Sequence, residues 1–133
     1  MSTLSINALE KAIWAALGAG IPEASGVFNS IAPPDQAYPF VTFHEQSDQT
    51  SYVYTERSWD DLVYEVKAIT RGDSTTEAND LARKIELVLT DNDLVLDEGT
   101  TMYLRKVSGF SYPEMDHGER FNHAGGLYRV WVG

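Results

Sequence analysis

The segment from Asp61 to Thr70 has the pattern of an extended chain with two distinct sides. Two sets of side chains lie on opposite sides of an extended chain here, namely Leu62, Tyr64, Val66 and Ala68 on one side and Val63, Glu65, Lys67 and Ile69 on the other. A period of two is typical of a β-strand. The segment therefore predicts a central strand of a sheet.

Two other segments have the spacing of amphipathic helices. The first covers about residues 5–17 and ends before Gly18, Gly20 and Pro22. Trp14 lies off its apolar stripe and either extends the buried face, which we expect, or is exposed for a partner. The second helix begins at the predicted capping box Ser74-Thr75-Thr76-Glu77. Its apolar positions are Ala78, Leu81, Ala82, Ile85, Val88 and Leu89.

The remaining extended segments complete a fold prediction. Short strands are expected at residues 25–28, 40–45, 94–96, 101–107 and 127–132, with 94–96 and 101–107 forming a hairpin. The order is then α-β-β-β-α-β-β-β, with strands in runs on either side of one helix. This order predicts an α+β fold, a mainly antiparallel sheet of about five to six strands with two helices packed on one face.

Length and polar stretches define the expected organisation. A chain of 133 residues predicts a single domain over residues 1–133. Residues 46–59 predict a long loop or a mobile hairpin arm, and residues 111–126 predict a second long polar connection. Stretches of this length usually carry a function.

Composition excludes several classes of function. The 20 acidic and 10 basic residues give a formal net charge of −10, which disfavours sequence-independent binding to nucleic acid. The absence of cysteine excludes disulfides and thiolate chemistry. The apolar stretch near the N-terminus is too short to span a membrane, so we expect no membrane partner.

No motif indicates catalysis. The chain has no Gly-rich phosphate loop and no nucleophile elbow, so we expect no cofactor and no catalytic residue. The histidines at 44, 117 and 123 suggest a metal site together with Glu45, Asp116 and Glu119, but no pair has helical i, i+4 spacing. A small metal-dependent enzyme therefore remains only an alternative.

Acidic residues gather between positions 73 and 98. They are Asp73, Glu77, Asp80, Glu86, Asp91, Asp93, Asp97 and Glu98, against Arg83 and Lys84 alone. This distribution is typical of a solvated helix face with its turns. A surface that repels passing DNA, as in the lining of a conduit, requires the same charge.

The chain resembles the tail completion, or tail terminator, proteins of long-tailed bacteriophages, prophages and gene transfer agents. The most specific phrase is Ala32-Pro33-Pro34-Asp35-Gln36-Ala37-Tyr38-Pro39-Phe40-Val41-Thr42-Phe43, followed by the strand Val63–Ile69 and the helix from Ser74. The N-terminal Ala/Leu helix and the strand Gly26-Val27-Phe28 also fit. The resemblance covers about residues 5–132.

The resemblance implies a structural, non-enzymatic protein. Such a protein forms a ring, typically a homo-hexamer, at the head-proximal end of the virion tail after assembly in the host cytoplasm. The expected partners are further copies of the chain, the major tail tube protein and a head-completion or connector protein, while DNA passes without specific binding. A head-closure or neck protein of the same particle and a generic interaction module are the alternatives.

Two groups of residues are candidates for these roles. Large side chains in the two polar stretches either anchor interfaces or cover the rim of the core, and they are Tyr52, Tyr54, Trp59, Tyr112, Met115 and Phe121. The candidates for lining the channel of a ring are Asp73, Glu77, Asp80, Asp91, Asp93, Asp97 and Glu98.

Overall fold

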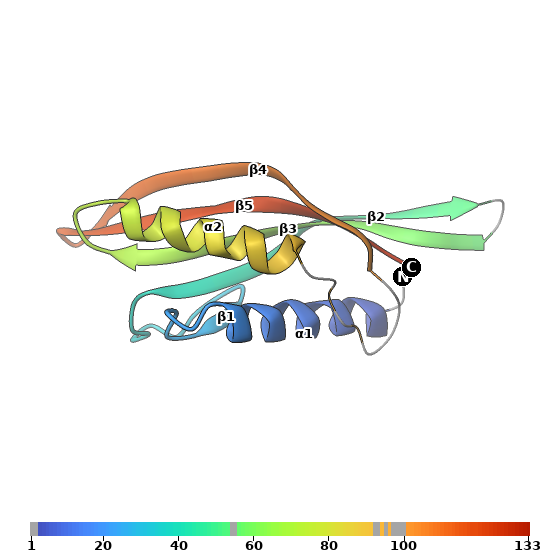
Figure 1. Cartoon of the computed structure of the whole chain (residues 1–133), viewed down its shortest axis with the longest axis horizontal. Helices are drawn as coiled ribbons and strands as arrows, with labels where there is room; N and C mark the ends of the chain where they lie inside the picture. Colours follow the sequence, from blue (N-terminus) through green and yellow to red (C-terminus); the bar gives the residue numbers. More distant parts are fainter. Residues whose placement is uncertain (1–2, 54–55, 92–93, 95, 97–100) are drawn as a thin grey trace.

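The described residues form two helices and a five-stranded sheet (Figure 1). The computed structural model describes residues 3–53, 56–91, 94, 96 and 101–133, with side chains described from residue 7 onward except at 47–59 and 102. The elements are α1 (Thr3–Gly20), β1 (Val27–Asn29), β2 (Phe40–Val53), β3 (Glu56–Arg71), α2 (Thr76–Thr90), β4 (Thr101–Asp116) and β5 (Glu119–Val132).

The predicted α+β class is confirmed. The strands lie in the order β1-β2-β3-β5-β4, and only the β1–β2 pair is parallel. β3 is the central strand, as its alternating pattern predicts. The structure has seven elements where the sequence predicts eight, because Leu94 and Leu96, the described residues of the segment 94–96, lie outside any strand.

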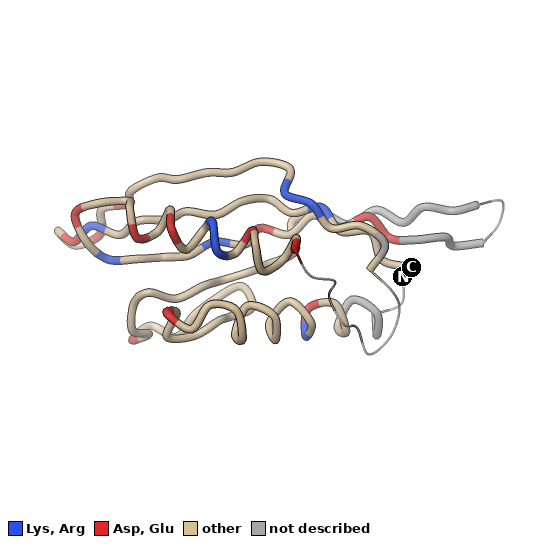
Figure 2. Tube along the Cα trace, in the orientation of Figure 1, with Lys and Arg blue, Asp and Glu red and all other residues tan. Residues whose placement is uncertain are grey.

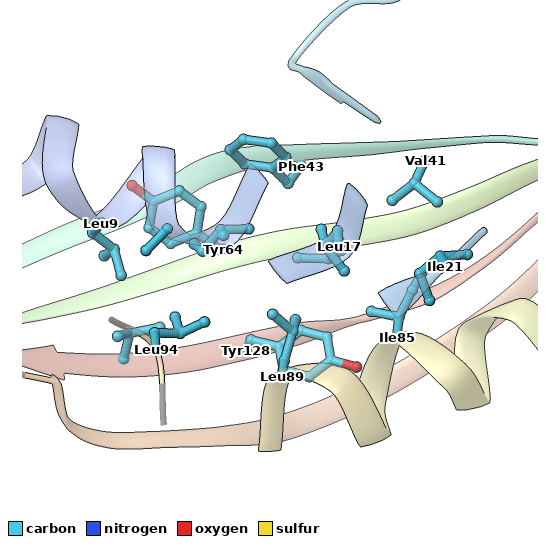
Figure 3. Packing of buried hydrophobic residues seen from close by; sticks show 14 of the residues in the cluster. Leu9, Leu17, Ile21, Val41, Phe43, Tyr64, Ile85, Leu89, Leu94 and Tyr128 are labelled. Carbon is cyan, nitrogen blue, oxygen red and sulfur yellow. The ribbon is translucent and has the colours of Figure 1, made fainter. Parts of the chain in front are cut away.

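Both helices cover the same face of the sheet. The predicted inward side chains of β3, Leu62, Tyr64, Val66 and Ala68, are all fully buried in one cluster with both helices. Figure 3 shows how Leu9 and Leu17 of α1, Ile21 directly after α1, and Ile85 and Leu89 of α2 meet the strand residues around Tyr64 and Tyr128. Burial of these apolar side chains is the main stabilising contribution to the fold.

Leu94 is also part of this cluster. It is buried although it belongs to no strand, and Leu96 packs against the same cluster. The predicted hairpin between 94–96 and 101–107 is therefore wrong, and β4 pairs with β5 instead.

Both long polar stretches lie within long β-hairpins. β2 and β3 pair from Phe40 and Ile69 out to Val53 and Glu56, and in Figure 1 this hairpin extends past the helices. β4 and β5 pair from Thr101 and Val132 to Asp116 and Glu119, with the turn at His117 and Gly118. A strand pair therefore occupies the segment 111–126, where the sequence predicts a polar connection.

Two glycines explain why that segment looks like a loop in the sequence. A Cβ on Gly125 would lie 2.5 Å from the Cα of Lys67 on β3, and one on Gly126 would lie 2.7 Å from the carbonyl oxygen of Ser108 on β4. Both glycines are buried inside β5. They are present because neighbouring backbones approach too closely for a side chain, and they mark no turn.

The helices differ from prediction in three details. α1 is longer at both ends than residues 5–17. The capping box is wrong, since the N-cap Thr75 makes no side-chain cap hydrogen bond and the Ser74 hydroxyl instead accepts from the Thr76 amide at 3.2 Å. Trp14 is 56% exposed, against the expected burial, while its Nε1 donates to the carbonyl of Val27 at 3.1 Å.

Candidate assembly interface

The face of the sheet turned away from the helices carries charged and aromatic side chains. We call it the open face, and its central positions are Asp61, Val63, Glu65 and Lys67 of β3 with Leu127, Arg129 and Trp131 of β5. The β3 side chains on this face are only partly buried, whereas their neighbours on the helix side are fully buried. The open face is therefore the side of the sheet that the two helices leave uncovered.

Ion pairs run across the open face. Arg129 Nε donates to both carboxylate oxygens of Asp61, at 2.9 and 3.2 Å. The Arg129 guanidinium holds the pKa of Asp61 below its usual value, with burial opposing this effect. Lys67 lies 3.8 Å from Glu65 along the same strand.

A cluster of two arginines and two aromatic rings lies at one end of this face. Tyr103 stacks on Trp131 with ring centroids 4.7 Å apart. Two residues further along each strand, on the same face, Arg105 and Arg129 lie opposite each other. The Arg105 guanidinium lies 5.6 Å from the Tyr103 ring, and that of Arg129 lies 5.9 Å from the Trp131 ring. We call these four residues the basic-aromatic patch.

A second group of aromatic rings covers the other end of the sheet. Tyr38 packs on Phe40 and Phe121, with centroid distances of 5.1 and 5.3 Å, and Phe40 meets Phe28 edge-on at 6.1 Å. The structure thus places the candidate interface residue Phe121 in an intramolecular cluster where it is half-buried. The residue remains an interface candidate, with less free surface than Tyr112 or Met115.

The end of the β4–β5 hairpin presents two of the predicted interface residues. We call residues 112–119 the β4–β5 tip. Met115 is 66% exposed, and Tyr112 stacks on His123 at 4.8 Å while remaining exposed. Exposed large apolar side chains next to a turn are typical of binding surfaces.

His123 links the tip to the body of the sheet. It is 8% exposed, and its Nε2 lies 3.2 Å from the Glu114 carboxylate. Burial lowers the pKa of His123, and the hydrogen bond with Glu114 opposes that shift. The folded protein therefore favours the neutral imidazole at this position.

Two of the three remaining interface candidates belong to the paired strands β2 and β3. Tyr52 and Trp59 occupy backbone positions in β2 and β3, where Tyr52 pairs with Arg57 and Trp59 pairs with Ser51. The side chains of both residues, and all of Tyr54, lie outside the described part of the chain. Their role as interface anchors stays a prediction.

The acidic candidates gather on and next to α2. Asp73, Glu77, Asp80 and Asp91 are all exposed, and Figure 2 shows acidic positions along this helix and the turn before it. Asp93, Asp97 and Glu98 lie outside the described residues. Their role in lining the channel of a ring stays a prediction.

A groove lies between α2 and the segment that follows α1. It has a volume of about 550 Å³, is lined by Pro39, Leu81 and Leu87 among others, and Lys84 pairs with Glu23 across it. Neither this groove nor the basic-aromatic patch was found from the sequence. The alternation Tyr103-x-Arg105 and Arg129-x-Trp131 was the only available signal for the patch.

The histidines do not come together. His117 pairs with Asp116 in the tip turn at 2.8 Å, and His123 pairs with Glu114. Among the described residues, no three His, Asp or Glu side chains are close enough to hold a metal ion. Within the same part of the chain, no helix is long and apolar enough to cross a bilayer.

The described residues thus present an open sheet face and two long hairpins. The chain belongs to the family of tail completion protein gp17, whose model matches residues 9–133. This membership indicates a structural role in virion tail assembly and points away from an enzyme.

Comparison with solved structures agrees on the fold. The chain matches a protein in the structure of the virion of a native gene transfer agent particle, with a TM-score of 0.78 and 18% identity over 98% of each chain. The predicted α+β sandwich is therefore one that exists in an assembled particle. No curated protein sequence matches this chain.

Proposed function

We propose that this protein is a tail terminator. In this proposal residues 1–133 act as a single domain, six copies close into a ring on the head-proximal end of the tail tube, and the ring offers the surface to which the head attaches. The partners are then further copies of the chain, the major tail tube protein and a head-completion or connector protein. The location is the virion tail, after assembly in the host cytoplasm.

The observation that carries this proposal is the family match over residues 9–133, nearly the whole chain. A ring subunit needs one surface for each neighbour and another for the tube. The open face, the exposed β4–β5 tip and the long β2–β3 hairpin are three separate surfaces suited to such contacts.

The acidic surface gives the proposal an electrostatic component. Asp73, Glu77, Asp80 and Asp91 are exposed in the structure, and a ring that turns them toward its channel repels the phosphate backbone. Asp93, Asp97 and Glu98 belong to the same proposal by their place in the sequence. DNA then passes through the ring without being held.

The test is the addition of purified protein to tail tubes that lack a terminator. We expect negative-stain images to show a cap at one end of each tube and no further growth when tube subunits are supplied. The control is the same protein added to heads with an exposed connector. Binding to those heads in the absence of tubes, with no effect on tube growth, would instead identify a neck protein.

A further inference from the structure

The basic-aromatic patch contains a cation, Arg105, that forms an ion pair with none of the described carboxylates. Arg105 and Arg129 are paired across β4 and β5, and like charges in directly opposite positions destabilise a sheet. The carboxylate of Asp61 forms an ion pair with Arg129 and so neutralises its charge. Arg105 is exposed and has no ion-pair partner among the described residues, although it lies over the Tyr103 ring.

Other basic residues are paired within the chain. Among the described side chains, five basic residues pair with carboxylates, namely Lys67, Arg71, Lys84, Lys106 and Arg129. In a chain with a net charge of −10, two copies repel each other unless acidic groups meet cations. An unpaired arginine beside two rings is therefore a suitable contact point for an acidic segment.

The β4–β5 tip has the complementary chemistry. Met115 is flanked in sequence by Glu114 and Asp116, and all three are exposed. A carboxylate forms short, strong hydrogen bonds with a guanidinium. The patch supplies the guanidinium of Arg105, which lies beside two aromatic rings.

The tip and the patch of one copy cannot meet. Tyr103 and Met115 lie on the same strand, and twelve residues of extended chain span about 40 Å. We infer that the basic-aromatic patch of one copy binds the β4–β5 tip of a second copy, with Asp116 or Glu114, which share one face of β4, on Arg105. This inference rests on the proposed ring and names the contact between its neighbours.

Such a contact joins two different surfaces. A contact of this kind forms a closed ring when the rotation between copies closes and an open filament when it does not. Within a pair, one copy keeps a free tip and the other keeps a free patch, so that further copies can add.

Crosslinking between two single-cysteine variants tests the contact, since the chain has no cysteine of its own. One copy carries Val107→Cys beside the patch, and the other carries His117→Cys in the tip, where both side chains are exposed. A short bismaleimide should convert an equimolar mixture to a mixed dimer. Charge variants are then introduced into one copy at a time.

Arg105→Glu in the patch copy should lower the yield of mixed dimer roughly tenfold, which corresponds to the loss of one charge-assisted contact. Arg83→Glu is the matched control, because Arg83 is an exposed arginine of α2 without an ion pair among the described residues. It should leave the yield unchanged. Asp116→Arg in the tip copy should restore crosslinking to the Arg105→Glu copy, and circular dichroism checks that each variant is folded.

The outcomes separate this contact from the proposed function. A yield that Arg105→Glu does not alter, or no mixed dimer at high concentration, overturns the contact. Rings seen by microscopy without the crosslink overturn the contact and leave the terminator proposal standing. Crosslinked copies that form only open filaments, even on tail tubes, support the contact and contradict a closed cap.

Discussion

Tyr64 and Tyr128 lie directly opposite each other on β3 and β5, and both are buried, but only Tyr64 has a hydroxyl with a hydrogen-bond partner in the structure. Tyr64 donates to Glu10 of α1 at 3.0 Å, and Asn29 donates to the same carboxylate at 3.0 Å. Figure 3 shows the two hydroxyls pointing in different directions. Burial raises the pKa of Tyr128 far above its usual value, with the charge of Glu86 adding to the effect.

This difference predicts opposite results for the same substitution. Tyr64→Phe should lower the free energy of unfolding by about 1 kcal/mol, because it removes a hydrogen bond that joins α1 to the central strand. Tyr128→Phe should leave stability unchanged or raise it, because its hydroxyl is buried without a partner. Urea unfolding of both variants provides the measurement, and equal losses would contradict the assignment.

The close approach of Gly125 to β3 predicts a strong steric effect. Gly125→Ala should destabilise the protein by about 1–3 kcal/mol or prevent folding, because the added carbon meets the backbone of Lys67 and not a movable side chain. Gly18→Ala is the control, since nothing lies within 4 Å of its added carbon, and it should gain roughly 0.5–1 kcal/mol from helix propensity. Thermal melts followed by circular dichroism compare the two variants.

The buried His123 predicts a pH dependence of stability. Its pKa is lower in the folded protein than in the unfolded chain, so the unfolded state binds more protons and stability falls as pH drops below the ordinary histidine value. We expect the melting temperature to decrease between about pH 7 and about pH 5.5, a window in which most carboxylates remain ionised.

Two substitutions check the source of this dependence. His123→Gln should flatten the decrease, because the remaining side chain does not titrate. His117→Gln should preserve it, because His117 is fully exposed in the tip turn. A decrease that survives His123→Gln would assign the effect to other groups.

The acidic surface next to α2 predicts a gain of DNA retention. Asp80→Lys should make assembled rings hold linear DNA in a salt-dependent way, because it places a ring of cations where the proposed channel lies. Asp35→Lys makes the same change of charge at an exposed position in the turn-rich segment before β2 and should not retain DNA. Equal retention by both variants would show that net charge alone, and not the channel, excludes DNA.

The sequence predicts the helices and the central strand well because their apolar periods are strong. The alternation around Tyr64 and the stripe from Ala78 to Leu89 both correspond to observed burial. The segment 111–126 misleads, because Pro113, Gly125 and Gly126 are typical of loops. Pro113 lies in β4, an edge strand that tolerates proline, and the glycines accommodate close backbones.

The candidate site is predictable only in part. Tyr112 and Met115 are suggested by residue type alone, and both are exposed in the tip. The basic-aromatic patch depends on which residues of β4 and β5 lie opposite each other. Bulges between Thr101 and Tyr103 and between Lys106 and Ser108 shift that register, and no local pattern in the sequence reveals such shifts.

Mass and symmetry of the assembled protein test the central claim most directly. Light scattering after size exclusion, across a concentration series and with tail tubes present and absent, should give six copies per particle, and negative-stain images should show a sixfold ring with a central hole. A particle that remains a single copy at every concentration, and that leaves the ends of tail tubes bare, would contradict the terminator account.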